Sequence, residues 1–155
     1  MKNLNRYSLI TLLAASTLTP LAMAADTATV AVSATVLGTC KFISAGSVAF
    51  PDLDPSNPVV VNGVVTQPQF WCTRNAAYTL SDDFGVNEAT AGTAPRRMSN
   101  GIDFIPYTFT YRPTGVGSGP ATPITMDIAA SISDVDYINA SAGAYTDTVT
   151  LTINP

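Results

Sequence analysis

Cys40 and Cys72 are the residues of this chain with the most evident chemistry, because they are its two cysteines and the chain has no histidine. Two thiols could form a disulfide, or either could serve as a nucleophile or a metal ligand. A nucleophilic thiol needs a neighbouring base, usually histidine, and zinc sites combine several cysteines and histidines. We therefore predict a Cys40–Cys72 disulfide, which would close a loop of about 33 residues and restrict the unfolded chain by roughly 3 to 4 kcal/mol.

The carboxylates and serines lack the spacing that catalysis or metal binding requires. Asp52 and Asp54 in "PDLDPSN" could contribute to a calcium site, but the glycine and the distant glutamate of a calcium loop do not follow. Ser118 in "GVGSGP" is outside a G-x-S-x-G pattern. Two further acidic pairs are typical of turns, Asp82 with Asp83 and Asp134 with Asp136. We expect no catalytic residue, no metal site and no cofactor.

Residues 1–24 have the pattern of a secretory signal peptide. Lys2 and Arg6 precede an apolar run, and Ala22 and Ala24 occupy the small-residue positions before a cleavage site. The alternative, a transmembrane anchor, needs about 20 apolar residues, and polar residues interrupt this run. We expect cleavage after Ala24, export, and no membrane insertion of the mature chain.

The composition of the mature chain favours one β-sheet domain. Removing 24 of the 155 residues leaves 131, with five basic and eleven acidic residues and a net charge of −6. This negative charge disfavours nucleic acid and anionic membranes as partners. Few charged residues and much valine, threonine, alanine and glycine are typical of a sheet protein.

Short alternating runs separated by proline and glycine predict about seven strands in a sandwich or barrel. Within "VVVNGVVTQPQFWC", the pair Asn62-Gly63 predicts a tight turn. The run "YTDTVTLTI" near the end predicts one half-buried strand. Its apolar face carries Val149, Leu151 and Ile153.

The stretch "ATVAVSATV", residues 28–36, alternates as regularly but has no hairpin loop that would fold it back onto the next strand. We expect it to project from the domain. One face, which needs burial, carries Ala28, Val30, Val32, Ala34 and Val36. A strand of this kind must be received by some sheet, either within its own chain as an ordinary first strand or in another copy.

The ordered set of motifs resembles the spore coat protein U family, the pilin-type subunits of archaic chaperone-usher pili. The motifs are the alternating strand leading into "GTCKF", then "FWCT", "YTLSDDFGVN", "RRMSNG" and "GAYTDTVTLTI". The resemblance implies an incomplete immunoglobulin-like β-sandwich that lacks its final strand, and an N-terminal donor strand that completes another subunit.

The same resemblance assigns regions and residues. Residues 25–37 would be the donor-strand extension, with the even-numbered side chains inserted, and residues 38–155 the pilin-like domain. Val149, Leu151 and Ile153 would line one wall of the acceptor groove. The disulfide would join the first two strands of the sandwich. Arg96 and Arg97 match "RRM" in the family pattern, and we expect them at a solvated strand edge.

The function implied is that of a structural subunit of a surface fibre, without enzymatic activity, supporting adhesion, biofilm or coat formation. Its partners would be a periplasmic chaperone, an outer-membrane usher, and other copies or related pilin subunits. The chain would be periplasmic during assembly and then part of a cell-surface or extracellular fibre. The alternative is a monomeric secreted β-sandwich that binds a ligand such as a carbohydrate.

Overall fold

The computed structural model describes residues 25–93 and 95–155. The predicted signal peptide lies outside the described residues. The chain divides into two compact units, Met1–Ala34 and Thr35–Pro155. In the first unit, residues 25–34 form no β-strand and their side chains are exposed.

The second unit is all-β, as predicted, with no α-helix among the described residues. Its elements are β1 (Cys40–Ser44), β2 (Ser47–Ala49), β3 (Val61–Asn62), β4 (Val64–Thr66), β5 (Gln69–Cys72), β6 (Ala77–Asp82), β7 (Arg96–Ser99), β8 (Phe104–Thr110), β9 (Thr114–Val116), β10 (Ile124–Thr125), β11 (Ala129–Ile132), the 3-10 helix η1 (Asp134–Asp136) and β12 (Leu151–Asn154).

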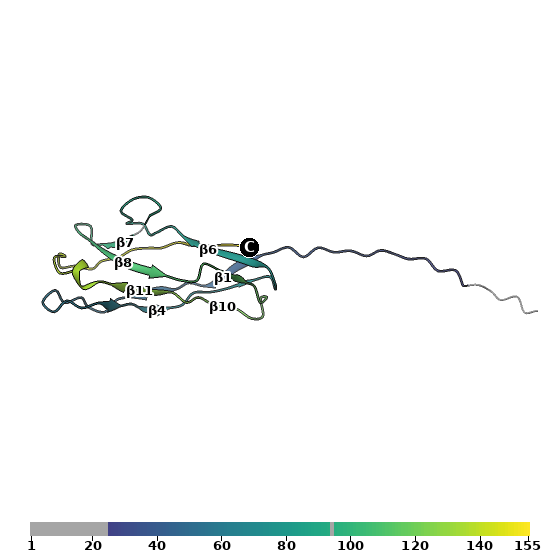
Figure 1. Cartoon of the computed structure of the whole chain (residues 1–155), viewed down its shortest axis with the longest axis horizontal. Coiled ribbons are helices and arrows are strands. Elements are labelled where there is room, and N and C mark those ends of the chain that lie inside the picture. The colour runs from purple at the N-terminus through teal and green to yellow at the C-terminus, as the bar shows by residue number, and fades with distance from the viewer. Residues whose placement is uncertain (1–24, 94) are drawn as a thin grey trace, which may run out of the picture. The chain divides into compact units, whose positions relative to one another are not determined.

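The strands form two antiparallel layers, the predicted immunoglobulin-like sandwich (Figure 1). In the first layer, β1 pairs with β5 and β2 pairs with β4. On their other side, β5 pairs with β10 and β3 pairs with β11. β11 then pairs with β8, and β8 pairs with β7 at the far edge of the layer. The second layer has the order β12-β6-β9. β8 belongs to the first layer and β9 to the second, and only three residues separate them, so the chain crosses between the layers at residues 111–113.

Alternating side chains from both layers fill the core. In β6, Tyr78 and Leu80 are buried between exposed neighbours, and they pack against Phe70 and Cys72 of β5. The rings of Phe70 and Tyr78 lie 5.0 Å apart in an edge-to-face arrangement. A second cluster occupies the other end of the sandwich and contains Val61, Ile105, Tyr107, Ile132 and Tyr137.

Two details of the predicted strands are wrong. Asn62-Gly63 does not form a tight turn, because the chain continues from β3 into β4 and the amide of Gly63 donates to the carbonyl of Ala130. A Cβ at Gly63 would lie 2.5 Å from Cγ1 of Val48, so glycine is needed for close packing rather than for a turn. The last strand begins at Leu151 and does not include the preceding residues from Tyr145.

Candidate functional site

A groove lies between two strand edges that belong to different layers. On one side, β1 and β2 each pair along one edge only, with β5 and β4. On the other side, β12 pairs only with β6 among the described strands. The groove between these edges has a volume of about 890 Å³. It is lined by residues 42–48, Phe50, Pro68, Met98, Tyr107, Phe109, Ile128 and residues 145–151.

The floor of this groove is apolar. Phe109 of β8 packs against both core clusters. Met98 of the neighbouring strand β7, and Ile128 just before the neighbouring strand β11, also line the groove. Exposed backbone edges above an apolar floor suit one kind of ligand, an extended chain with alternating side chains. Its main chain would pair with the edges, while every second side chain would enter the groove.

The three residues predicted for one wall have different places. Val149 and Leu151 line the groove. Ile153 is not among the lining residues, because it pairs with Leu80 of β6 and packs against the first core cluster.

Residues 145–150, the wall segment, are held by separate hydrogen bonds to Ser99, Val86 and Asp83 rather than by a regular ladder. Thr146 exchanges two backbone hydrogen bonds with Ser99 of β7, at 2.9 and 3.0 Å. The amide of Val86 donates to the carbonyl of Thr148 at 3.1 Å. The amide of Thr150 donates to the carboxylate of Asp83 at 2.9 Å. The backbone hydrogen bonds of the wall segment thus come from β7 and from residues 83–86, which follow β6.

Asp147, which was not predicted from the sequence, anchors the middle of the wall segment. Its carboxylate accepts a 2.7 Å hydrogen bond from the hydroxyl of Tyr107 and two longer ones from Asn87. Burial and this carboxylate raise the pKa of Tyr107 far above its ordinary value, so the phenol stays protonated and donates. Gly85, with a φ of +89°, leaves the space for Asp147, because a Cβ there would overlap the carboxylate.

Comparison with protein families finds one family model that covers most of the chain. The Spore Coat Protein U domain matches residues 26–152. The chain belongs to the Spore Coat Protein U domain family. The match includes the alternating segment 28–36 as well as both walls of the groove, so the extension and the sandwich are parts of one family pattern.

One solved structure with a similar chain comes from Acinetobacter baumannii. It is the crystal structure of the CsuC-CsuE chaperone-tip adhesion subunit pre-assembly complex from archaic chaperone-usher Csu pili. The similarity has 21% sequence identity and a TM-score of 0.45, and covers 77% of this chain and 40% of that chain. This Spore Coat Protein U domain thus spans less than half of that chain's length. Comparison with curated proteins finds no match.

Arg96 of this Spore Coat Protein U domain is buried, which corrects the prediction of a solvated strand edge. It is 9% exposed and donates two 2.6 Å hydrogen bonds to the carboxylate of Asp82. The hydroxyl of Tyr111 donates to the same carboxylate at 2.7 Å. Burial raises the pKa of Asp82, but the bonds from Arg96 and Tyr111 outweigh it and hold that pKa below its ordinary value.

The Arg96 guanidinium also lies over the ring of Phe109, 5.2 Å from its centroid, and donates to the Phe109 carbonyl. Since Phe109 forms part of the floor, this ion pair between β7 and β6 supports the groove from beneath. An inward-facing charge needs such a partner, because an isolated buried ion is strongly unfavourable.

Arg97 is likewise not a free solvated side chain. Its guanidinium donates to the carbonyls of Asn87 and Glu88 and lies 4.1 Å from the centroid of Phe104. It thereby fixes the loop that presents Asn87 to Asp147. The two arginines of "RRM" thus contact different parts of the groove. Arg96 packs on Phe109 of the floor, and Arg97 holds Asn87, which donates to Asp147 of the wall.

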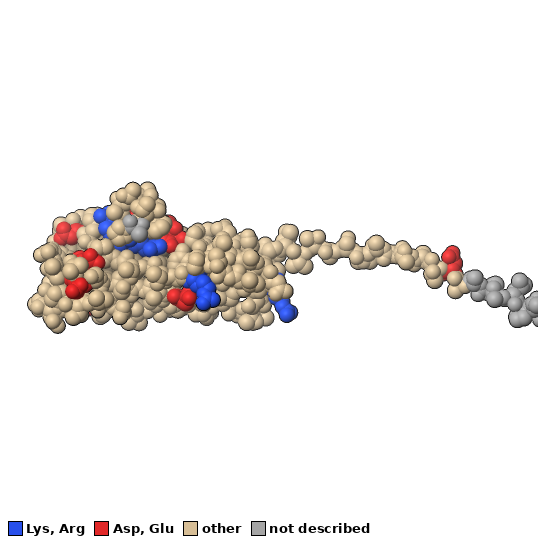
Figure 2. Space-filling view, viewed as in Figure 1, with Lys and Arg blue, Asp and Glu red and all other residues tan. Residues whose placement is uncertain are grey.

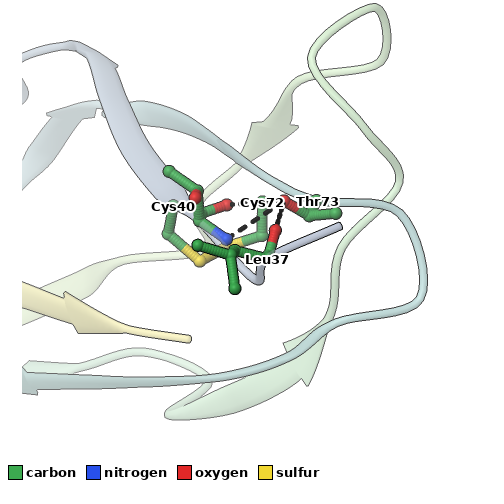
Figure 3. The surroundings of a disulfide bond; sticks show 5 residues. Leu37, Cys40, Cys72 and Thr73 are labelled. Carbon is green, nitrogen blue, oxygen red and sulfur yellow. Dashed lines mark hydrogen bonds between the residues drawn. A yellow bond between two sulfur atoms is a disulfide. The ribbon is translucent and has the colours of Figure 1, made fainter. Parts of the chain in front are cut away.

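Cys40 and Cys72 form the predicted disulfide, between directly opposite residues of β1 and β5 (Figure 3). It joins the first strand of the sandwich to its neighbour at the point where the chain enters the domain. The next residue, Thr73, makes hydrogen bonds to the chain on both sides of Gly38.

The five side chains predicted to insert are all exposed: Ala28, Val30, Val32, Ala34 and Val36. Val30 is 85% exposed and Val32 is 90% exposed. Their assignment to a donor strand stays a prediction.

The remaining surface has few charged side chains, and those visible in Figure 2 form separate small groups of both signs. Over residues 25–93 and 95–155, no three His, Cys, Asp or Glu side chains are placed to hold a metal ion. None of the helices in that part of the chain is long and apolar enough to cross a membrane.

Proposed function

We propose that this protein is a structural subunit of a surface fibre, assembled by donor-strand exchange. The N-terminal segment 28–36 of one copy would enter the groove of another and supply the missing strand between β1–β2 and the wall segment. The observation that carries the proposal is the combination, in one chain, of an apolar groove with two unpaired edges and an exposed segment whose sequence alternates.

The lengths of the two parts agree. The β1–β2 side of the groove extends from Phe42 to Phe50, which is nine residues, and segment 28–36 is also nine residues long. At about 3.3 Å per residue, each spans roughly 30 Å. A strand of that length would pair with the whole edge.

The side chains of the segment are also of a suitable size. Its inward face consists of alanine and valine only. The floor is already filled by large side chains, among them Phe50, Met98 and Phe109. A floor occupied by large side chains favours small inserted residues, and each valine that becomes fully buried contributes about 1.5 to 3 kcal/mol.

A subunit with such a groove needs protection before assembly, because an exposed strand edge beside apolar surface promotes aggregation. We therefore propose a periplasmic chaperone that pairs with the groove, and an outer-membrane usher at which a second copy or a related pilin replaces it. Export fits the disulfide, which is typical of oxidising compartments. The assembled location would be the cell surface or an extracellular fibre.

The proposed role is structural rather than enzymatic. The ionisable side chains next to the groove already serve its framework. Asp147 accepts from Tyr107 and Asn87, while Asp82 and Arg96 neutralise each other. The hydrogen bonds of these side chains hold the wall and the floor of the groove in place.

The test compares two adjacent substitutions on opposite faces of the segment, Val32→Asp and Ser33→Asp. Mature protein from a periplasm that also expresses cognate chaperone and usher is run unheated on an SDS gel. We expect wild type and Ser33→Asp to give a heat-labile ladder of multimers, and Val32→Asp to give monomer. Equal ladders from both variants, or monomer from wild type, would contradict the proposal.

A further inference from the structure

Thr73 continues the pairing of β1 with β5 beyond the disulfide. Its amide donates to the carbonyl of Thr39 at 2.8 Å, and its Oγ1 accepts from the amide of Thr39 at 3.0 Å. The hydroxyl proton has two acceptors within reach, the carbonyls of Leu37 at 3.2 Å and Thr39 at 3.3 Å. One hydroxyl donates one proton, and the Leu37 carbonyl is the nearer of the two acceptors, so we assign the proton to Leu37.

These hydrogen bonds hold residues 37–39 in line with β1 (Figure 3). They lie on the β5 edge of the chain, which is the edge away from the groove. Val36 and Leu37 remain 83% and 77% exposed. The direction in which residues 37–39 leave β1 is thus set by Thr73 rather than by burial of neighbouring side chains.

Gly38 marks the point where the two sides of the groove meet. A Cβ at Gly38 would lie 3.6 Å from Cβ of Pro155 and 3.7 Å from Cβ of Ala76. Figure 1 shows the C-terminus beside the start of β1. Neighbouring strands lie about 4.8 Å apart, so a third strand between two others needs about 9.5 Å. A separation at van der Waals contact leaves no space for one, and the groove is closed at this end.

An extension that entered the groove of its own chain would therefore have to reverse direction within residues 37–39. The reversal would break the hydrogen bond from Thr73 to the Leu37 carbonyl. It would also require residues 37–39 to form a turn, whereas the structure pairs Thr39 with Thr73 as a continuation of β1. An extension from a second copy is not attached at this end and has no such constraint.

We propose that Thr73 is a positioning residue that suppresses self-insertion and so directs the extension to another copy. This inference rests on the proposed donor-strand function and adds the feature that selects a neighbouring copy over the same chain.

The test uses a chain carrying both Ser33→Cys and Thr148→Cys. Thr148 lines the groove and is exposed, and Ser33 lies on the outward face of the segment. The native cysteines are both in the disulfide, so a short bis-maleimide links only the introduced thiols. On a heated, reducing SDS gel, a link within one chain gives monomer that migrates anomalously, and a link between chains gives dimers and larger species.

We expect mainly intermolecular product with Thr73 present. Thr73→Val, which keeps the branched shape without the hydroxyl, should raise the intramolecular fraction about 3- to 10-fold, the change expected from one hydrogen bond. Thr73→Ser retains the hydroxyl and should match the wild type. Insertion of Asn-Gly between Leu37 and Gly38 supplies a turn while keeping Thr73, and should also increase the intramolecular product.

The outcomes separate the two proposals. If Thr73→Val and the insertion both give the same product ratio as Thr73→Ser, with intermolecular links present in all, the role of Thr73 is wrong and the donor-strand function stands. If no variant forms either link, the segment does not enter the groove, and both proposals are wrong.

Discussion

The hydroxyl of Tyr107, on the floor of the groove, donates a 2.7 Å hydrogen bond to the carboxylate of Asp147 in its wall. This contact joins β8 in the first layer to a segment that has no regular strand pairing of its own. It fixes the width of the groove at its middle, and the position of the wall therefore depends on a polar pair within a mainly apolar site.

Tyr107→Phe should lower the free energy of unfolding by about 1 to 2 kcal/mol, because the ring is kept but the carboxylate of Asp147 loses its shortest hydrogen bond. Tyr145→Phe is the matched control, since its hydroxyl bonds only to the carbonyl of Ser141 in an exposed loop. Urea unfolding of the mature chain measures both. A smaller loss for Tyr107→Phe than for Tyr145→Phe would contradict this role.

Asp82→Ala should be strongly destabilising, by about 3 to 5 kcal/mol, because it leaves the buried guanidinium of Arg96 without its partner. The double variant Asp82→Leu with Arg96→Met removes both charges and should lose less than the single variant. Asp83→Ala, which affects an exposed hydrogen bond to Thr150, is the control. If the losses of the single variants Asp82→Leu and Arg96→Met add up to the loss of their double variant, the pair is not coupled.

Stability should fall in acid. The hydrogen bonds from Arg96 and Tyr111 leave the pKa of Asp82 below its ordinary value despite burial, so the folded state binds fewer protons than the unfolded state. The stabilisation is fully present above the unfolded-state pKa, near 3.9, and is lost as the pH falls through the lower folded value. Unfolding midpoints from pH 7 to pH 2 should decline below about pH 4, and less steeply in the double variant of Asp82 and Arg96.

Replacing both cysteines by alanine should destabilise the chain by roughly 3 to 4 kcal/mol, since the disulfide limits the unfolded loop between β1 and β5. Thermal unfolding of wild type with and without reductant provides an independent measure. If the reduced protein and the double alanine variant unfold at the wild-type midpoint, the disulfide does not stabilise the fold.

The all-β class, the disulfide and the family were predictable because each depends on local pattern or on residue counts. Alternation marks strands wherever one face is buried, and two cysteines in an exported chain have one intramolecular pairing. The tight turn predicted at Asn62-Gly63 is wrong, because glycine in this dipeptide also occurs where a neighbouring side chain approaches the backbone, as Val48 does here.

The polar supports of the groove were missed, although the pattern contains a signal for them. Asp147 shares the face of Val149 and Leu151, and Asp82 shares the face of Leu80. A charged residue on an otherwise apolar face requires a partner from another strand. Its identity, such as Arg96 for Asp82, depends on the register of strands far apart in the sequence, which the pattern of a single strand does not contain.

Amide hydrogen exchange on assembled multimers reports whether segment 28–36 becomes a hydrogen-bonded strand in the groove. We expect slow exchange over residues 28–36 in the multimer, together with new protection in the wall segment at residues 145–150, and fast exchange of residues 28–36 in the Val32→Asp monomer. Exchange of residues 28–36 in the multimer at the rate of an unstructured peptide would show that the segment is not a donor strand.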